Sequence, residues 1–290
     1  MNIKSFFENQ LNVWLLAKQN YDALNRVKVK ELDLGACKVR VQFNPERMRS
    51  TAAKVDVKSL RERPCFLCRA NRPPEQQDFA YNDKYSILVN PFPIFPVHLT
   101  IPTLKHVDQL IYDSFGDMLD IAKDLKDFVV FYNGPKSGAS APDHMHFQAG
   151  NKGFLPLEND VVSLEHVDLV VDGEVMRYSL KNYHRNMIVL ESKDQTQLVS
   201  YFKKLYSEME IKVGEVEPMM NIVSWYAEDK WYCCVFPRKK HRPDRFYAEG
   251  EENLLFSPAS VDLGGVCVLP QEKDFVKIKT EDLIEIFEEI

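Results

Sequence analysis

The 290-residue sequence has no apolar run long enough to span a bilayer and no excess of positive charge. A membrane-spanning helix needs about 20 consecutive apolar residues. The formal net charge is −6, which argues against a broad surface for long nucleic acids. We therefore expect neither a membrane nor a nucleic acid as partner, whereas a small anion in a local basic pocket stays compatible with the sequence.

Cysteine is sparse, and a leader segment is missing. Six cysteines in a chain of this length do not form a disulfide scaffold. Four of them stand in apolar, strand-like runs and are predicted to be buried thiols: Cys37, Cys233, Cys234 and Cys267. Residues 1–6 show neither a secretory apolar region nor a cleavage site. These features predict a cytoplasmic protein.

Hydrophobic residues make up 45% and charged residues 28% of the chain, as in ordinary soluble domains. Hydrophobic periodicity predicts an α+β module over residues 1–155 and a second α+β half over 156–290. The first half is predicted to begin with a helix over residues 3–26 and a hairpin over 27–43. Strands over 85–90 and 97–102 follow, then a helix over 105–126 opened by His106 and a strand over 128–133. The second half repeats the order strand, helix, strand, strand, but without a convincing sequence repeat.

The stretch Asp143-His144-Met145-His146-Phe147-Gln148 alternates polar and apolar residues. Read as a strand, it places His144, His146 and Gln148 on one face and the two apolar residues on the other. We predict that the apolar pair packs on a core and that the polar trio lines a site.

A loop of small residues comes just before this strand. Residues 133–140 read Asn-Gly-Pro-Lys-Ser-Gly-Ala-Ser, with Lys136 as the only charge. Backbone amides in such a loop can turn toward a phosphate. The loop and the strand together predict a nucleotide-phosphate site centred on a histidine, although Lys136 alone also fits a solvated loop charge.

A metal site is the second prediction. Cys65 and Cys68 have the spacing of a zinc knuckle, and no second Cys-x-x-Cys follows. Histidines or acids must then complete a tetrahedron, and His106 and His144 are the candidates. Two alternatives stay open: a redox pair of cysteines, and two reduced cysteines near unrelated histidines.

Two basic segments are ambiguous. Arg47 and Arg49 follow a strand end and can reach an anionic ligand, but a solvated loop explains them equally. The run Arg238-Lys239-Lys240-His241-Arg242 is ordinarily a solvated face, yet it can also guide phosphates to a pocket.

Together these motifs resemble the histidine-triad superfamily. Cys-x-x-Cys, the strand-helix step with His106, the Asn-Gly…Ser-Gly-Ala-Ser loop and His-x-His-x-Gln look like its transferase branch, which holds galactose-1-phosphate uridylyltransferase, diadenosine tetraphosphate phosphorylase and GDP-L-galactose phosphorylase. The hydrolase branches end the motif in a third histidine, where this sequence has Gln148. The resemblance covers residues 40–150 well and extends weakly over 220–223 and 231–238.

The resemblance implies an antiparallel sheet with flanking helices and two such halves in one chain. It implies a structural zinc held by Cys65, Cys68, His106 and His144, with His146 as the nucleophile. Gln148 would hydrogen-bond the attacked phosphate. The remaining contacts to substrate would come from Arg47, Arg49, Asn90, Asn133, Lys136, Ser137, Gly138 and Ser140.

The predicted function is nucleotidyl transfer or phosphorolysis through a covalent nucleotidyl-histidine, with phosphate or a sugar phosphate as acceptor. A glutamine in the third position cannot titrate, which suffices when the leaving group is already a phosphate. Two alternatives remain: a nucleotide hydrolase of the same fold, and a non-catalytic zinc protein that binds nucleotides. The base, the sugar and the choice between monomer and homodimer stay open.

Overall fold

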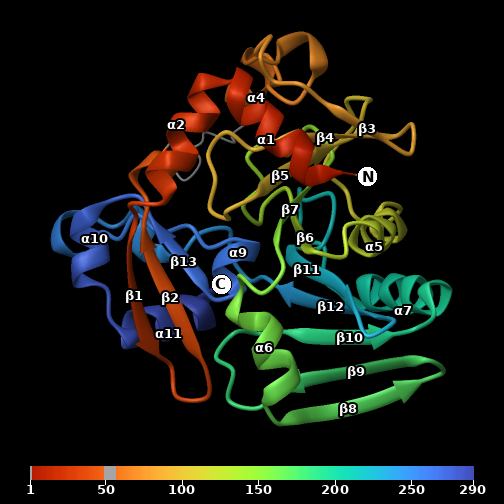
Figure 1. The fold of residues 1–290 in the computed structure, drawn as a ribbon. Coiled ribbons are helices and arrows are strands. Elements are labelled where there is room, and N and C mark those ends of the chain that lie inside the picture. Colours follow the sequence, from red (N-terminus) through yellow and green to blue (C-terminus); the bar gives the residue numbers. More distant parts are fainter. Residues whose placement is uncertain (1, 49–56) are drawn as a thin grey trace.

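A ten-stranded sheet runs through the whole molecule. In the computed structural model, which describes residues 2–48 and 57–290, its strands follow the order β3-β4-β5-β7-β6-β11-β12-β10-β9-β8. Each pair of neighbouring strands is antiparallel, as the resemblance implies. Figure 1 shows this sheet twisting from β3 near the top to β8 at the bottom.

The two halves of the sheet mirror each other in order. The first half contains β3 (Phe79–Tyr81), β4 (Tyr85–Val89), β5 (His98–Pro102), β6 (Phe128–Asn133) and β7 (His146–Asn151). The second contains β8 (His166–Asp172), β9 (Val175–Leu180), β10 (Ile188–Ser192), β11 (Met220–Ala227) and β12 (Lys230–Pro237). Each strand from β3 to β7 corresponds in turn to one from β8 to β12. Corresponding strands lie at equal positions on the two sides of the β6–β11 pair.

Two helices cover one face of the sheet. α5 (Phe115–Asp124) and α7 (Gln195–Glu208) lie side by side, one from each half (Figure 1). Their buried faces meet where Phe115 and Phe202 stack with ring centroids 3.8 Å apart. This layer buries one large apolar core and joins the halves.

The predicted helix over residues 105–126 is wrong in its first part. Residues 105–111 are not helical, and α5 begins only at Phe115. Their backbone instead bonds to the segment before β7, through Gln109 N to Pro142 O and Met145 N to Val107 O. The apolar side chains that suggested a helical stripe, Val107 and Leu110, are exposed.

A three-stranded sheet and several helices cover the opposite face. β1 (Lys28–Asp33) and β2 (Lys38–Phe43) form the predicted hairpin, and β13 (Val266–Leu269) joins β2 in parallel. Around them lie α6 (Pro156–Ser163), α9 (Ser260–Leu263), α10 (Glu272–Lys277) and α11 (Thr280–Glu289). An N-terminal hairpin is thus completed by a C-terminal strand, and a second core fills the space beneath.

The predicted N-terminal helix over residues 3–26 is two helices. α1 (Ile3–Val13) and α2 (Leu15–Leu24) are separated by Trp14, whose backbone is extended. Trp14 is only 4% exposed. A continuous helix would place the indole elsewhere, so the break accompanies burial of Trp14.

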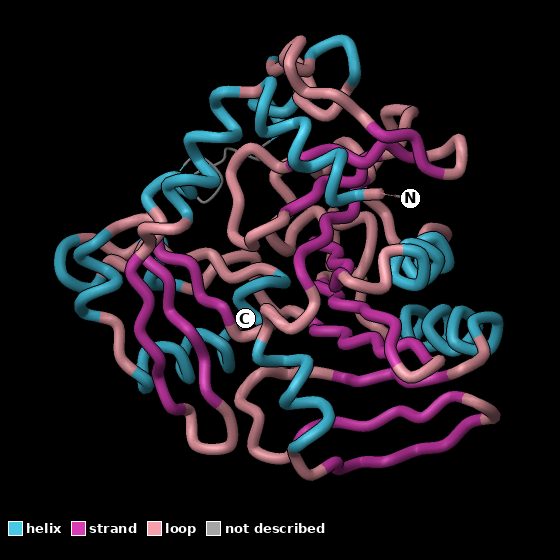
Figure 2. The backbone as a smooth tube through the Cα atoms, viewed as in Figure 1, coloured by secondary structure: helices cyan, strands magenta, loops and turns pink. Residues whose placement is uncertain are grey.

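Short elements complete the chain. They are α4 (Val57–Glu62), α8 (Asp244–Tyr247) and the 3-10 turns η1 (Pro45–Arg47), η2 (Arg69–Asn71) and η3 (Gly250–Glu252). Figure 2 shows the loops, in pink, around the upper part of the sheet.

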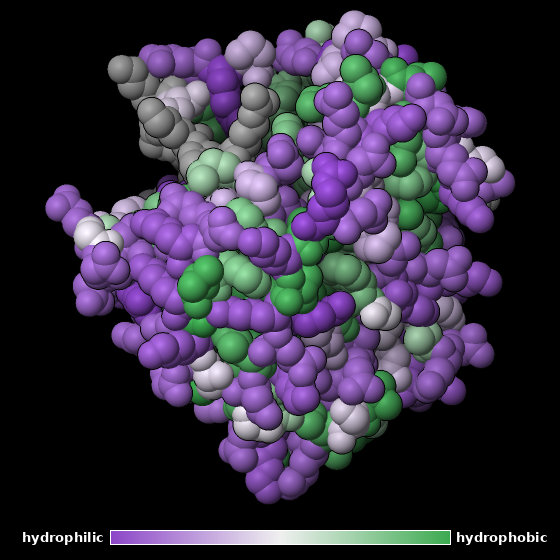
Figure 3. Space-filling view, turned by 60° about the vertical axis from the view of Figure 1, so that its left-hand side comes forward, coloured by the Kyte–Doolittle hydropathy of each residue, from purple (hydrophilic) through white to green (hydrophobic). Residues whose placement is uncertain are grey.

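The outer surface is mainly hydrophilic. In the space-filling view, hydrophobic residues form small groups between polar ones (Figure 3). Within the described residues no helix has the length and apolar character needed to cross a bilayer.

Candidate functional site

A cavity of about 450 Å³ lies where β4, β5, β6 and β7 face the C-terminal segment 241–268. The predicted site residues that line it are Arg47, Asn90, Asn133, Gly138, Ser140, His146 and Gln148. Seven of the predicted nucleophile and substrate contacts, drawn from five separate segments of the chain, are therefore brought together around one space.

The strand β7 alternates as predicted, although it starts later. Met145 and Phe147 belong to the core beneath α5, whereas His146 and Gln148 line the cavity. The strand begins at His146, and His144 lies in the turn that precedes it. The expected strand over 143–148 is thus too long at its start, because His144 N donates to the carbonyl of Ala141 in a turn and Met145 N to that of Val107.

His146 presents one ring nitrogen to the cavity. Its Nδ1 lies 2.8 Å from the backbone oxygen of His144. A carbonyl only accepts, so Nδ1 carries the proton and Nε2 keeps its lone pair. Burial lowers the pKa of His146 to about 4, against the smaller raising effect of that carbonyl. The ring is therefore a neutral nucleophile near neutral pH.

The backbone of His146 is held by a side chain rather than by the neighbouring strand. The β6–β7 ladder ends at the pair Phe131↔Gln148. One step further, the Gln109 amide donates to the carbonyls of Asn133 (3.0 Å) and His146 (2.9 Å) and accepts from His146 N at 2.7 Å. Gln109 is fully buried. The two strands separate around it, which opens room between the side chains of Asn133 and His146.

Asn133 has its amide oriented by two donors. Its Oδ1 accepts from Asn221 Nδ2 (2.8 Å) and Ser260 N (3.0 Å). The Ser260 hydroxyl lies 2.7 Å from both this oxygen and the carbonyl of Tyr132, and its single proton serves one of them. The Nδ2 group is left as the donor at the cavity wall. Residues of the second half therefore fix a donor beside the nucleophile of the first half.

The loop 134–140 contributes unevenly. Gly138 and Ser140 line the cavity, but Lys136 and Ser137 do not. Ser137 is fully buried, and its carbonyl accepts from Asn221 Nδ2 at 2.6 Å. Its expected contact with phosphate oxygens therefore has no support in the cavity wall.

Gly138 is required by the shape of this loop. Its φ is +97°, a region that side chains disfavour, and an added Cβ would lie 2.7 Å from Ala259 Cβ. The loop can therefore approach the C-terminal segment only with glycine at this position.

The remaining predicted contacts divide in role. Arg47 lines the cavity and donates to the carbonyl of Phe92 at 2.7 Å. Asn90 also lines it, but its Oδ1 accepts from Phe92 N at 2.9 Å and its Nδ2 donates to Thr100 Oγ1 at 3.1 Å. Arg49 lies outside the described residues.

Sequence reasoning did not assign several residues of the cavity lining to the site. His98, Arg63, His241, Arg242 and Asp262 line the cavity. The basic run 238–242 gave a signal for two of them. Arg238 itself is buried and donates to Asn221 Oδ1 at 2.8 Å, so it is no solvated charge. Asp262 belongs to no motif, because only the packing of α9 brings it to the cavity.

The electrostatics of the cavity reflect burial. Burial lowers the pKa of Arg47 to about 10 and raises that of Asp262 to about 6. The pKa of His241 falls to about 4, first by burial and then by the charges of Arg242, Arg238 and Lys136. Lys136 thus adds positive potential near the cavity without lining it.

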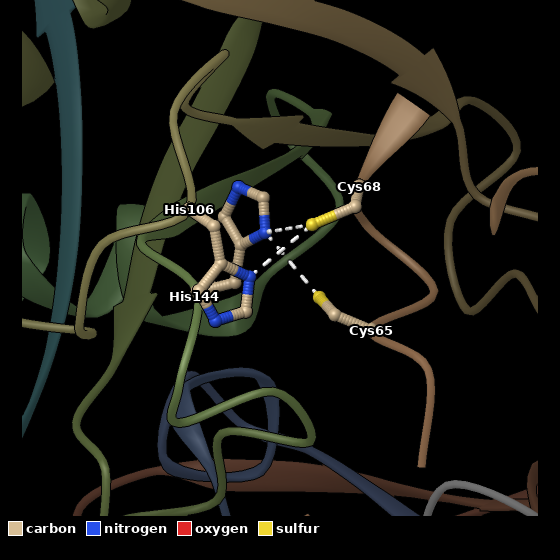
Figure 4. Close-up of side chains that lie close together, drawn as sticks. All are labelled: Cys65, Cys68, His106 and His144. Carbon is tan, nitrogen blue, oxygen red and sulfur yellow. Dashed lines mark hydrogen bonds between the residues drawn. The ribbon is translucent and has the colours of Figure 1, made fainter. Parts of the chain in front are cut away.

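The four predicted metal ligands form one cluster. Their ligand atoms all lie within 4.8 Å of one another. Figure 4 shows both histidine rings turned toward the two sulfur atoms. Cys65 Sγ lies 3.3 Å from His144 Nδ1, and Cys68 Sγ lies 3.2 Å from His106 Nδ1.

The geometry of this cluster suits zinc. Tetrahedral Zn–S and Zn–N bonds place sulfur and nitrogen about 3.5 Å apart. His144 Nε2 donates to the carbonyl of Thr103 at 2.8 Å, so Nδ1 keeps the lone pair that a metal needs. His106 Nε2 lies 3.7 Å from Asp143 Oδ2. His144 thus has the hydrogen-bonded outer partner that zinc ligands usually have, whereas His106 has a carboxylate nearby but beyond hydrogen-bond distance.

The family model described as a domain of unknown function (DUF4922) matches residues 6–151, half of the chain. The chain belongs to this family. Its matched segment includes the metal cluster and the site strand β7. A comparison with curated proteins gives no match.

Several solved structures have a fold similar to that of this DUF4922 protein. Yeast Ap4A phosphorylase Apa2 shares 19% identity with a TM-score of 0.61, over 95% of this chain and 96% of that one. Its complex with Ap4A gives 18% and 0.59, over 97% and 95%. Its complex with AMP gives 17% and 0.57, over 96% and 94%. The predicted fold, an antiparallel sheet with flanking helices, is therefore confirmed, and these phosphorylase structures share it.

Proposed function

We propose that this protein is a nucleotidyltransferase or phosphorylase that forms a nucleotidyl intermediate on His146. Its substrate is a nucleoside diphosphate sugar or a dinucleoside polyphosphate, and its acceptor is a phosphate or a sugar phosphate. The observation that carries the proposal is the Nε2 lone pair of His146, fixed by the His144 carbonyl, beside the amides of Asn133 and Gln148 in one cavity.

The reaction would proceed in two displacements. His146 Nε2 attacks the α-phosphorus, the P–N bond forms, and the P–O bond to the leaving phosphate breaks with its electron pair on oxygen. The acceptor oxygen then attacks the same phosphorus, and the electron pair of the P–N bond returns to Nε2. The Nδ1–H bond to His144 is kept throughout and stabilises the charge that the ring gains.

The oriented amides account for the stabilisation of charge. Two donors hold Oδ1 of Asn133, so its NH2 group faces the cavity. Donors that are fixed before the reaction stabilise developing charge on phosphoryl oxygens without reorganisation. Neither amide can donate a proton outright, which favours phosphate leaving groups over alkoxides and supports transfer over hydrolysis.

The two walls of the cavity suit the two parts of a nucleotide. Trp14, Leu16 and Phe92 give an apolar wall near the break between α1 and α2, suited to a base. Arg63 and Arg242 give a basic wall, suited to phosphates, and His241 adds a neutral ring beside them. Yeast Ap4A phosphorylase, whose complexes contain Ap4A and AMP, has the same fold.

The cluster of Cys65, Cys68, His106 and His144 would hold a structural zinc. A metal bound there ties the loop 65–68 and the segment 103–106 to the turn before β7. It would thereby fix the carbonyl of His144 that selects the tautomer of His146.

The proposal is tested by trapping the intermediate. Purified protein is incubated with Ap4A and with nucleoside diphosphate sugars, without an acceptor, and its intact mass is measured. We expect a nucleotidyl adduct on wild type that is lost on adding phosphate, and no adduct on His146→Ala.

A matched control is His184→Asn. His184 is far from the motif in sequence, outside the cavity lining, and has φ +56°, which asparagine tolerates. It should retain the adduct and the turnover. Turnover by His146→Ala at the wild-type rate would overturn the proposal, as would wild-type turnover with water as the only acceptor needed.

A further inference from the structure

His98 lies outside the His-x-His-x-Gln motif, and the proposed reaction gives it no role. It begins β5, pairs with Gly150 of β7, and is fully buried. Tyr21 holds its backbone, donating to His98 O at 3.0 Å and accepting from His98 N at 3.1 Å. Phe95 and Phe131 pack around the ring, with centroids 5.4 and 5.8 Å away. The ring therefore has one fixed orientation.

The hydrogen bonds of this ring determine where its proton lies. The backbone N–H of Ile94 points at Nδ1 across 3.2 Å. A backbone amide can only donate, so Nδ1 accepts and carries no proton. Nε2 of the neutral ring then carries the proton, and it lies 3.0 Å from Oε1 of Gln148.

This bond in turn fixes the amide of Gln148. Oε1 accepts from His98 Nε2 and, more weakly, from Asn90 Nδ2 at 3.4 Å. A rotated amide would point its NH2 group at two donors, which costs both bonds. The NH2 group of Gln148 is therefore directed at the cavity, in the same sense as that of Asn133.

We propose that His98 is a positioning residue, which holds the oxygen of the Gln148 amide so that its NH2 group meets the phosphate of the substrate. This inference rests on the proposed function and adds a residue to it. The direction is set by an unbroken chain from a backbone amide, through an imidazole, to a side-chain amide. Burial keeps His98 neutral, because it lowers the pKa of the ring to about 3.

Two substitutions separate this role from simple packing. In His98→Asn, the short amide takes the place of Nδ1, so the bond from Ile94 is kept and the donor to Gln148 is lost. In His98→Gln, the longer amide reaches the place of Nε2, so a donor to Gln148 is restored while the bond from Ile94 is lost. A role confined to the local turn predicts damage in His98→Gln alone.

The functional readouts are nucleotidyl transfer and the affinity for AMP, with adenosine as the probe that has no phosphate. We expect His98→Asn to lower the transfer rate and the AMP affinity about tenfold to a hundredfold. Adenosine affinity should stay unchanged. His98→Gln should stay within about threefold of wild type in both readouts. His98→Asn that matches wild type, or His98→Gln that fails as badly as His98→Asn while folded, overturns the inference.

A double substitution tests the route of the effect. In Gln148→Ala, the amide that His98 holds is absent, so adding His98→Asn should change neither transfer nor AMP affinity further. A full second loss would show that His98 acts elsewhere, and the inference would fall.

A spectroscopic readout keeps this test apart from the proposed function. Long-range 15N–1H spectra of the unliganded protein should show His98 protonated at Nε2 and bare at Nδ1, with an Nε2 signal that shifts in Gln148→Ala. A proton on Nδ1 overturns the inference whatever the enzyme does. The expected tautomer without any nucleotidyl transfer would instead count against the proposed function.

Discussion

At the residue scale, the site is a set of polar side chains whose free atoms are chosen by partners behind them. The carbonyl of His144 leaves Nε2 of His146 free, and donors behind Asn133 leave its NH2 group free. Each partner is itself buried and bonded. The cavity thus offers one nucleophile and oriented donors without rearrangement, which is the condition for electrostatic stabilisation of a transferring phosphoryl group.

Asn133→Asp tests the donor at this scale. The substituted oxygen keeps its bonds from Ser260 and Asn221, but the NH2 group becomes an anionic oxygen facing the phosphate. We expect nucleotidyl transfer to fall by about 10²–10³-fold, as for the loss of one oriented donor. The measurement is the single-turnover rate of adduct formation.

Asn159→Asp serves as the control, because Asn159 is an exposed side chain on α6. It adds the same negative charge and should leave the rate unchanged. A wild-type rate in Asn133→Asp would show that this amide does not contact the transferred group.

At the element scale, the site depends on an interruption of the sheet. β6 and β7 are paired up to Phe131 and Gln148, and beyond that the Gln109 amide replaces the ladder. The segment that carries Gln109 also carries His106, and the turn before β7 carries His144. A metal bound by Cys65, Cys68, His106 and His144 would therefore tie together the two segments that open the strands.

Removal of metal should loosen this junction. We expect one zinc per chain in the purified protein, and a chelator should lower the melting temperature by roughly 10 °C, since structural zinc supplies folding energy. Metal content and thermal unfolding are measured together on wild type and Cys68→Ser.

The variant supplies the internal control for the chelator. Cys68→Ser lacks one of the four ligands, so it should bind less metal and melt at the same temperature with and without chelator. Metal-free wild type that melts like the loaded protein would argue that the cluster is only a set of reduced thiols and imidazoles.

At the scale of the whole molecule, two similar halves build one site. The ten-stranded sheet is symmetric in order about β6 and β11. In the first half a long loop, 134–145, joins β6 to β7, whereas Glu228 and Asp229 alone join β11 to β12. Trp225 and Tyr232 stack there at 5.1 Å. The second half therefore contributes support, through Asn221 and Ser260, and part of the lining of the one cavity described above.

A buried carboxyl joins the halves behind the site. Glu217 precedes β11, is 3% exposed, accepts from Ile111 N at 3.0 Å and is bonded to Tyr132. Burial raises its pKa to about 7, although both hydrogen bonds oppose this. When protonated, Glu217 can donate to Tyr132, whose hydroxyl then donates to the carbonyl of Gln109 at 3.1 Å.

This carboxyl predicts a pH dependence of stability. The folded state binds the proton more tightly than the unfolded state, so the contribution is complete below the unfolded pKa of 4.5 and is lost as pH rises through about 7. Stability should fall by roughly 3 kcal/mol over that window from this group. Glu217→Gln should remove this part of the slope, measured by urea unfolding across about pH 4 to pH 8.

Glu210→Gln is the matched control, because Glu210 is exposed in the same connection between α7 and β11. It should keep the wild-type slope. Equal slopes in wild type and Glu217→Gln would mean that Glu217 has the same pKa in the folded protein as in the unfolded chain.

Local patterns were enough to predict most of the strands and the alternation of side chains in the motif. Period-two alternation around His146 indicated which side chains face the site and which face the core, and the structure confirms it for Phe147 and Gln148. Helical periodicity misled at Val107 and Leu110, because their backbone bonds to a distant segment. Alternation depends on neighbours in sequence, whereas that bond does not.

The sequence by itself determined the fold class, the four residues of the metal cluster and the position of the candidate nucleophile. Each of these is encoded in side-chain type and short-range spacing. Only the tertiary structure decided which nitrogen of His146 is free, that Gln109 separates β6 from β7, and that His98, Asp262 and Arg242 line the cavity. Hydrogen-bond partners across a sheet and residues delivered by a distant helix are long-range contacts, and no local pattern records them.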